Sequence, residues 1–172
     1  MLYSTDTSLN KFHVRYTSVT MAHIHELIDW TAGVYIVHNN KVLIRLHEKY
    51  NIWIHVGGHV ELDEDPVQAA IRECKEEVGL DIIIYDAGPI PSELTTGNRH
   101  LITPAHMNIH YVNDTHQHCD LLYYATSETD VIIPENPGEQ SVWLTKEEVE
   151  KHPDMEPQIK FYALGALEAL QT

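Results

Sequence analysis

Short runs of β-branched and aromatic residues dominate the first third of the chain. Residues 31–38 (TAGVYIVH) and 41–47 (KVLIRLH) form two such runs, and only Asn39 and Asn40 separate them. A two-residue asparagine loop favours a hairpin turn with positive φ angles, so we predict two strands joined by a tight turn. Before them, apolar residues spaced through 19–28 predict a short helix.

A helix with clear start and end signals follows a third predicted strand at 51–56. Asp65 suits the N-cap, Pro66 the first helical position, and Gln68 the reciprocal position of a capping box. Gly79 supplies the C-terminal stop. Five apolar residues at helical spacing form the predicted buried stripe, namely Val67, Ala70, Ile71, Cys74 and Val78.

The rest of the chain mixes further strand and helix signals. The predicted strands are 81–86, 105–112, 118–126 and 141–144, and the predicted helices are 146–151 and 158–170. Residues 88–104 are rich in turn-forming residues and long for a connection, which indicates a functional loop. Strands and helices mixed on one short chain predict an α/β or α+β fold. We expect one domain at 29–172, with 1–28 as an N-terminal segment packed on it.

Composition and charge limit the classes of partner. The chain has 172 residues, of which 43% are apolar and 22% charged, as in a globular domain with a substantial core. A formal net charge of −15 disfavours binding along a nucleic-acid backbone, which requires a basic surface. Small phosphorylated substrates stay open, because a bound metal ion can supply positive charge locally.

The expected setting is the cytoplasm. No apolar run approaches the length of a membrane helix, and residues 1–11 contain no apolar signal segment. Two cysteines, Cys74 and Cys119, form no disulfide framework. A homodimer is the default expectation for a small soluble enzyme.

Three carboxylates on the predicted helix carry the strongest chemical signal. Glu73, Glu76 and Glu77 lie one helical turn apart, behind Gly57 and Gly58. Like charges this close repel one another unless a positive group lies among them. Carboxylate oxygens with room left for substrate phosphates suit Mg²⁺ or Mn²⁺. The sequence therefore predicts a site for a hard divalent cation.

The same segment resembles the Nudix box, which is Gly, five residues, Glu, seven residues, then Arg-Glu-aliphatic-X-Glu-Glu-X-Gly-aliphatic. The matching positions are Gly58, Glu64, Arg72, Glu73, Cys74, Glu76, Glu77, Gly79 and Leu80. The one departure is Cys74, where the family usually has a larger aliphatic residue; cysteine still packs as a small apolar side chain. The resemblance implies an α/β/α sandwich with a central mixed sheet.

The resemblance also implies an activity and roles for residues. The activity is metal-dependent hydrolysis of a nucleoside diphosphate linked to another moiety, such as a nucleoside triphosphate, nucleotide sugar or dinucleotide polyphosphate. Glu76 and Glu77 would be the main metal ligands, Glu73 a ligand or proton acceptor, and the Gly57 carbonyl a further ligand. Arg72 would orient the carboxylates.

Other interpretations of the helix compete with this one. An acidic helix with routine Arg–Glu pairs is often only a solvated face. A Nudix-like fold can also serve as a nucleotide- or metabolite-sensing module without turnover, and degenerate box residues would favour that interpretation. Isomerase chemistry on an allylic diphosphate fits less well, because the hydrolase pattern is complete here.

Residues outside the box are weaker candidates. Glu139, just before the strand at 141–144, is the first candidate for the general base, and Glu93 in the long loop is the second. His59 follows the two glycines and could reach the substrate. Aromatic residues that could stack on a nucleobase are Trp53, Tyr111, Tyr123 and Tyr124. Cys119 has no recognisable base partner, which disfavours a catalytic thiol.

Histidines alternate along the two strands that precede and follow 113–115. His106, Asn108 and His110 share one face, as do His116, His118 and Asp120. A hairpin register that joins the two sets would produce one polar, histidine-rich patch. Three interpretations stay open: a half-exposed strand face without a ligand, a substrate contact that includes His59, His118 and Asp120, and a transition-metal site.

Overall fold

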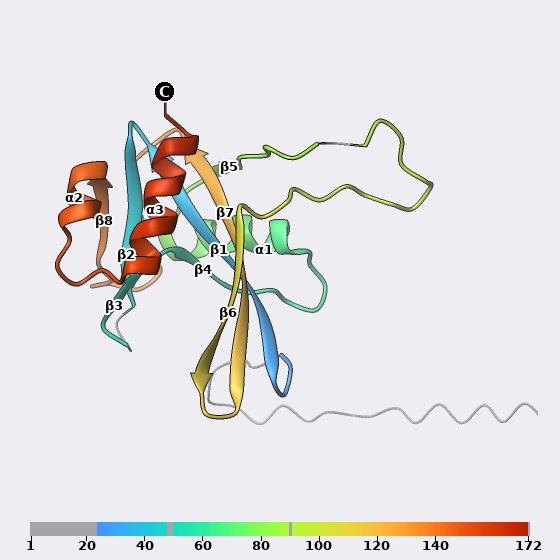
Figure 1. Cartoon of the computed structure of the whole chain (residues 1–172), viewed down its shortest axis with the longest axis horizontal. Coiled ribbons are helices and arrows are strands. Elements are labelled where there is room, and N and C mark those ends of the chain that lie inside the picture. Colours follow the sequence, from blue (N-terminus) through green and yellow to red (C-terminus); the bar gives the residue numbers. More distant parts are fainter. Residues whose placement is uncertain (1–23, 48–49, 90, 172) are drawn as a thin grey trace, which may run out of the picture.

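The computed structural model describes residues 24–47, 50–89 and 91–171. Along this part of the chain, strands precede and follow a first helix, and two more helices come last (Figure 1). The elements are β1 (Ile28–His38), β2 (Lys41–His47), β3 (Ile52–Ile54), β4 (Val56–His59), α1 (Pro66–Val78), β5 (Ile82–Ile84), β6 (His106–Asn113), β7 (His116–Ser127), β8 (Ser141–Thr145), α2 (Lys146–Lys151) and α3 (Pro157–Ala169).

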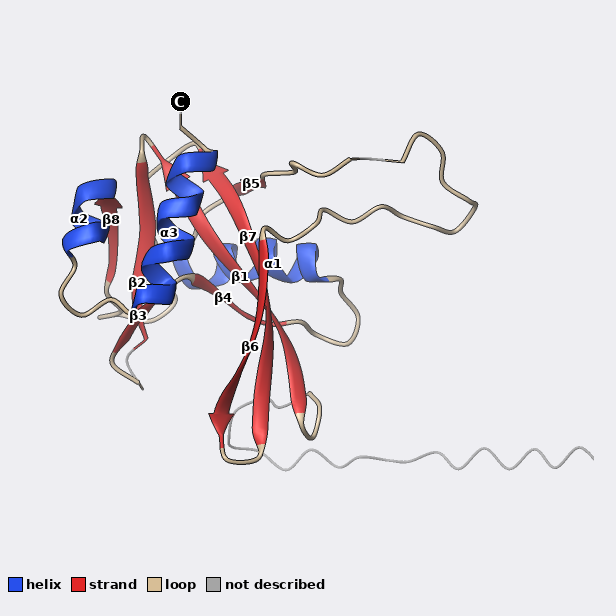
Figure 2. Ribbon diagram, in the orientation of Figure 1, coloured by secondary structure: helices blue, strands red, loops and turns tan. Residues whose placement is uncertain are grey.

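The strands form one mixed sheet with helices on both faces (Figure 2). Its main order is β3-β2-β1-β7-β5, while β4 pairs with β1, β6 with β7 and β8 with β2. The long β1 and β7 run parallel, and the other pairs are antiparallel. The predicted α/β/α sandwich with a central mixed sheet is confirmed.

Each face of the sheet has its own apolar core. On one face, Ala70, Cys74 and Val78 of α1 pack in a cluster with apolar residues of β1, β4 and β7. On the other face, Val149 of α2 joins a cluster with residues of α3. The buried residues of α3 are Ile159, Ala163, Ala166 and Leu167. Both layers follow from burying one apolar stripe per helix.

Local signals along the sequence are confirmed at the hairpin and at α1. Asn39 and Asn40 have φ angles of 48° and 59°, as a tight turn between β1 and β2 requires. Asp65 accepts hydrogen bonds from backbone N–H groups at the start of α1, and Gln68 completes the capping box. Gly79 ends the helix with a φ of 72°.

Some predictions were wrong in detail. The helix at 19–28 is absent from its described part, since 24–27 form bends and Ile28 begins β1; residues 19–23 lie outside the described residues, as does most of the predicted 1–28 segment. The single strand at 51–56 is divided into β3 and β4. Ile71 is 44% exposed, whereas Ala69, which lies outside the predicted stripe, is buried, because the face that contacts the sheet extends toward Ala69 and not toward Ile71.

The connection between β5 and β6 projects from the body of the molecule (Figure 1). Its described residues form neither helix nor strand, in agreement with the predicted long loop. Strands β1, β6 and β7 extend from the body in another direction (Figure 2).

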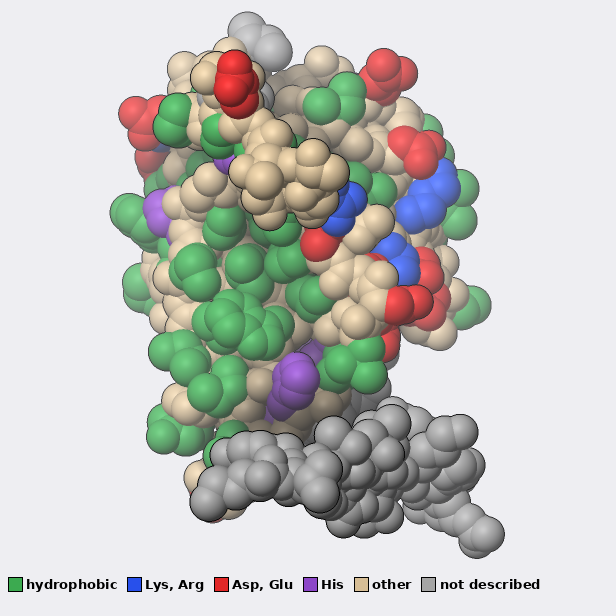
Figure 3. All heavy atoms as spheres, turned by 90° about the vertical axis from the view of Figure 1, so that its right-hand side faces the viewer, with side chains coloured by type: hydrophobic (Ala, Val, Ile, Leu, Met, Phe, Trp, Pro, Cys, Tyr) green, Lys and Arg blue, Asp and Glu red, His purple; other side chains and the backbone are tan. Residues whose placement is uncertain are grey.

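Large apolar side chains remain exposed on these extended strands. They include Trp30, Met107, Ile109 and Tyr111. Figure 3 shows hydrophobic side chains over much of one face, with charged side chains gathered along one flank. None of the helices in the described part of the chain has the length and apolarity needed to span a membrane.

Candidate active site

Two glycines in β4, Gly57 and Gly58, bring the backbone of this strand against α1, and we call this pair the glycine turn. Gly57 pairs with Gly33 of β1 and has a φ of 145°. A Cβ atom on Gly57 would collide with the carbonyl oxygen of Ala32, so a larger residue requires a backbone shift. Glycine is needed at this position both for its φ angle and for the close approach of two strands.

Glu77 of α1 is held against this turn. The backbone N–H of Gly57 donates to Glu77 Oε2 at 2.9 Å, and Arg45 of β2 forms an ion pair with Glu77 Oε1. Burial nevertheless raises the pKa of Glu77 to about 7, against the opposing effects of Arg45 and the Gly57 hydrogen bond. Arg45 and the Gly57 N–H therefore do not fully offset the cost of burying the ionised carboxylate.

Glu73 lies beside the second glycine. A Cβ atom on Gly58 would fall on the Glu73 carboxylate, so the small residue leaves the space that this carboxylate fills. Burial raises the pKa of Glu73, while Arg72 acts in the opposite direction through a hydrogen bond of 2.8 Å from Nη1 to Glu73 Oε1. Two carboxylates with raised pKa values thus lie next to the glycine pair.

We define the acidic group as Glu73, Glu76 and Glu77 of α1 together with Glu64, which precedes the helix, and Arg72 contacts three of these four. It donates to Glu64 from Nε at 3.1 Å and from Nη2 at 2.6 Å, and Nη1 reaches Glu76 at 3.0 Å. Its Nη2 also donates to the backbone carbonyl of His59 at 2.9 Å. The hydrogen bonds to Glu64 are the main reason that the pKa of Arg72 is raised. These contacts place the Arg72 guanidinium among three carboxylates and one backbone carbonyl.

The arrangement suits a hard divalent cation. Glu73 and Glu77 are largely buried, with side chains 14% exposed, whereas Glu76 is 55% exposed and leaves the group open to solvent. A cation among them would restore the ionised form that burial disfavours. Carboxylate oxygens with open positions for other ligands fit Mg²⁺ or Mn²⁺.

Metal affinity is expected to depend on pH through Glu77. Because burial raises its pKa to about 7, the metal-free protein carries a proton there below that pH, and this proton must leave before a cation binds. We expect Mn²⁺ affinity to rise by about tenfold per pH unit up to about pH 7 and then to level. Calorimetric titration over that range measures this, and Glu77→Gln, which removes a ligand, should bind Mn²⁺ more weakly and with a flatter dependence on pH. A profile unchanged in that variant would contradict the assignment.

Glu139 lies near Glu77 because both carboxylates pair with the guanidinium of Arg45. Arg45 Nη2 is 3.6 Å from Glu139 Oε1, and the other end of the same guanidinium holds Glu77. Asn136 Nδ2 also donates to Glu139 at 2.9 Å, and the Glu139 side chain is 14% exposed. Glu93, the second candidate, is exposed in the long loop. The geometry thus brings Glu139 beside the metal candidates.

The predicted substrate-binding residues, His59, His118 and Asp120, lie together on the face of the sheet opposite to α1. His59 and His118 lie with ring centroids 4.8 Å apart, and Asp120 accepts a hydrogen bond from Thr31. Burial and neighbouring histidines lower the pKa of His118 to about 4, so its ring is neutral at pH 7. The hairpin register places His110 opposite His118, which confirms that the two predicted sets share a face.

The aromatic residues that could stack on a nucleobase differ in how far their rings are exposed. Tyr123 and Tyr124 are 2% and 6% exposed within the two cores, so neither offers a free ring face to a base. Trp53 is partly buried and packs against His152, whereas Tyr111 is 69% exposed on β6.

The two cysteines are free, with Cys74 buried in the core beneath α1. Burial raises the pKa of both thiols, as expected for residues without a nucleophilic role.

Two residues with direct contacts to these groups were not predicted from the sequence. Arg45 could have been noticed as the one charged residue inside the run KVLIRLH, with apolar neighbours on both sides, where an unpaired charge would be costly. Asp29 is completely buried and contacts His59 and His116. Its position gave no local signal, because both partners are distant in sequence.

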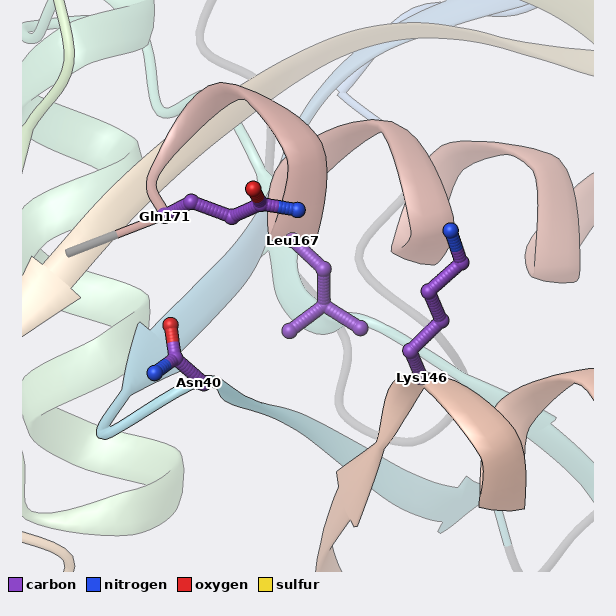
Figure 4. Close-up of a pocket in the computed structure, with 4 residues that line it drawn as sticks. All are labelled: Asn40, Lys146, Leu167 and Gln171. Atoms are coloured by element: carbon purple, nitrogen blue, oxygen red, sulfur yellow. The ribbon is translucent and has the colours of Figure 1, made fainter.

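A shallow hollow of about 220 Å³ lies elsewhere, between the β1–β2 turn and the end of α3 (Figure 4). Side chains of Asn40, Lys146, Leu167 and Gln171 line it. In Figure 4, Leu167 lies between the polar side chains of Asn40 and Lys146. No carboxylate is among these four residues, so this hollow is separate from the acidic group on α1.

Comparisons with known structures agree with the geometry of the fold. A hydrolase of the NUDIX family from Clostridium perfringens is 35% identical, with a TM-score of 0.76 over 83% of this chain and 98% of that one. An ADP-ribose pyrophosphatase from Streptococcus suis is 14% identical, with a TM-score of 0.53 over 84% of this chain and 92% of that one. At the lower identity the likeness concerns the fold alone.

Sequence comparisons give a short and a long match. The m7GpppN-mRNA hydrolase NUDT17 of Xenopus laevis is 45% identical over 47 residues, a segment that covers 24% of this chain and 16% of that protein. This chain therefore spans only a small part of the length of that curated relative. The family model described as NUDIX domain matches residues 28–164, most of the chain. The chain belongs to the Nudix hydrolase family.

Proposed function

We propose that this protein is a divalent-metal-dependent pyrophosphohydrolase, which cleaves the pyrophosphate bond of a nucleoside diphosphate linked to another moiety. One observation carries the proposal: the complete acidic group on α1 is held in place against the glycine turn. Arg72 binds Glu64, Glu73 and Glu76, while Arg45 and the Gly57 N–H bind Glu77. A sensing module without turnover has no need to keep every one of these charged positions.

The proposed roles follow from the contacts of each residue. Glu73, Glu76 and Glu77, with the carbonyl of Gly57, would hold Mg²⁺ or Mn²⁺. The bound ion supplies positive charge that offsets the charge developing on the phosphate oxygens and lowers the pKa of water. Arg72 keeps the carboxylates oriented, because its guanidinium N–H groups donate five hydrogen bonds to the carboxylates and the carbonyl around it.

Glu139 is the proposed general base. It is linked to Glu77 by Arg45, so a carboxylate from the loop before β8 lies beside the metal candidates. We expect Glu139→Gln to lower kcat by about 10²-fold or more, with little change in KM, because the amide cannot accept the proton of an attacking water. Steady-state kinetics at saturating Mg²⁺ measures this, and Glu93→Gln is the matched control from the other loop. A rate within about twofold of the unaltered protein would exclude the role.

The substrate class is proposed to be small and anionic. The names of similar proteins refer to different compounds, m7GpppN-mRNA and ADP-ribose, so likeness alone does not select one. The net charge of −15 favours a small nucleotide over a long nucleic acid, which would be repelled away from the metal. Nucleoside triphosphates, nucleotide sugars and dinucleotide polyphosphates all contain the required bond.

A substrate panel tests the activity and the substrate class together. The full chain is incubated with each compound and Mg²⁺, capped RNA included, and the products are identified by mass spectrometry. We expect release of a mononucleotide and a second phosphorylated product from at least one small compound, and no release with chelator. Saturable binding without release across the panel would show a sensing module instead.

A further inference from the structure

Six polar residues form a second group, on the face of the sheet opposite to α1. We define the histidine cluster as Asp29, His59, His110, His116, His118 and Asp120. The strand registers bring it together, because Asp29 lies opposite His118 on β1 and β7, and His110 opposite His118 on β6 and β7. Thr31 pairs with both His59 and Asp120. Side chains at such positions project from one face.

Asp29 is at the centre of the buried part of this cluster. It is completely buried, and its Oδ1 accepts a hydrogen bond of 2.6 Å from the backbone N–H of His25. Its Oδ2 faces the other way, 3.1 Å from His116 Nε2 and 3.4 Å from His59 Nε2. This carboxylate oxygen therefore has two imidazole nitrogens as near neighbours.

Both ring nitrogens of His116 lie near acceptor atoms. Nδ1 of His116 lies 3.3 Å from the backbone carbonyl of Glu26, which can only accept, so this contact favours a proton on Nδ1. In a neutral ring, Nε2 then presents a lone pair toward Asp29 Oδ2 at 3.1 Å. Two acceptors at that distance repel unless a cation or a second proton lies between them. A ligating histidine commonly donates its other N–H to a backbone carbonyl in this way.

His118 adds a third donor. Its Nε2 is buried and has no hydrogen-bond partner among the residues that the structure describes. One ligand atom from each of Asp29, His116 and His118 lies within 4.8 Å of the others. Donor atoms about 2.0–2.1 Å from a tetrahedral ion are roughly 3.3–3.5 Å apart, so a small inward movement of the side chains is enough.

We propose that Asp29, His116 and His118 bind one transition-metal ion of the zinc class, at a site separate from the acidic group on α1. Two imidazoles with one carboxylate suit Zn²⁺ or Co²⁺, whereas Mg²⁺ prefers oxygen ligands alone. His59 Nε2, close to Asp29, is the nearest candidate for a fourth ligand. The ion would join β1 to β7, whose ligands are 87 positions apart in sequence.

Metal titration of the full, tag-free chain tests this site. The background is a variant with Glu76→Gln and Glu77→Gln, which removes binding at the acidic group. Zn²⁺ is titrated by calorimetry and Co²⁺ by visible absorption, after removal of bound metal with chelator. We expect one ion per chain, with the strong absorption of a tetrahedral, nitrogen-ligated Co²⁺ in place of the weak bands of an octahedral oxygen site.

Variants then identify the ligands. His118→Gln and Asp29→Asn should each weaken Zn²⁺ binding by at least about 100-fold, since changes around ligands alone cost 10–100-fold. His152→Gln, at the C-cap of α2 and beside Trp53 of β3, is the matched histidine control and should bind as the background does. Absence of stoichiometric binding would overturn the proposal, as would undiminished binding in the two ligand variants. The Co²⁺ spectrum of the background decides the matter if a ligand variant fails to fold.

Discussion

Replacing Glu77 with glutamine is expected to lower Mg²⁺-dependent turnover by about 10³-fold or more. The side chain keeps its size but loses the charge that Arg45 and the Gly57 N–H now hold against the glycine turn. Charge stabilisation by a bound ion contributes several kcal/mol to such reactions, and about 4 kcal/mol corresponds to about 10³ in rate. The value of kcat/KM on the substrate selected by the panel measures the loss.

Two comparisons separate this loss from misfolding. Glu150→Gln removes a carboxylate from the exposed surface of α2 and should leave turnover unchanged. Thermal unfolding of Glu77→Gln should stay close to that of the parent, because burial already disfavours the ionised form of Glu77. If the folded variant retained its Mg²⁺-dependent rate, Glu77 could not be a ligand of the catalytic ion.

The sequence predicted the elements whose signals lie in neighbouring residues. Asp65 and Gln68 complete their capping box within four residues, and Asn39 with Asn40 fills a turn without help from other elements. Such local choices agree with the final fold, so pattern and propensity are enough to find them. The acidic group is equally local, since Arg72 and its acceptor Glu76 belong to one turn of α1.

What the sequence could not supply depends on pairing between distant segments. Arg45 reaches Glu77 and Glu139 only because β2 pairs with β8 and the sheet carries α1 on the same side. Ile71 was expected inside because periodicity defines a stripe to within about one residue, while contact with the sheet decides its edge. Asp29 meets His116 through the parallel pairing of β1 and β7, which no local pattern announces.

His59 connects the acidic group and the histidine cluster. Its carbonyl accepts from Arg72, while its ring lies beside Asp29 and His118. The backbone of β4 therefore faces one group and this side chain the other. A displacement of β4 would therefore disturb both groups together.

Gly57→Ala is expected to lower the free energy of unfolding by about 3–5 kcal/mol and to abolish turnover. Two costs add at this position. A φ of 145° is rarely adopted by residues with a side chain, and the new Cβ atom would collide with the carbonyl oxygen of Ala32, which belongs to the backbone of β1 and cannot rotate away. Relief requires β4 to move from β1, and the N–H that holds Glu77 moves with it.

Gly97→Ala is the matched control, because Gly97 has a φ of 88° but a Cβ atom added there would meet no other atom within 4 Å. It carries the backbone strain without the collision, so a loss of about 1 kcal/mol is expected from urea unfolding, with turnover unchanged. The difference between the two variants measures the close approach of β4 to β1. Equal losses would mean that the glycine is required only for its φ angle, and the acidic group would then keep its ligand geometry in Gly57→Ala.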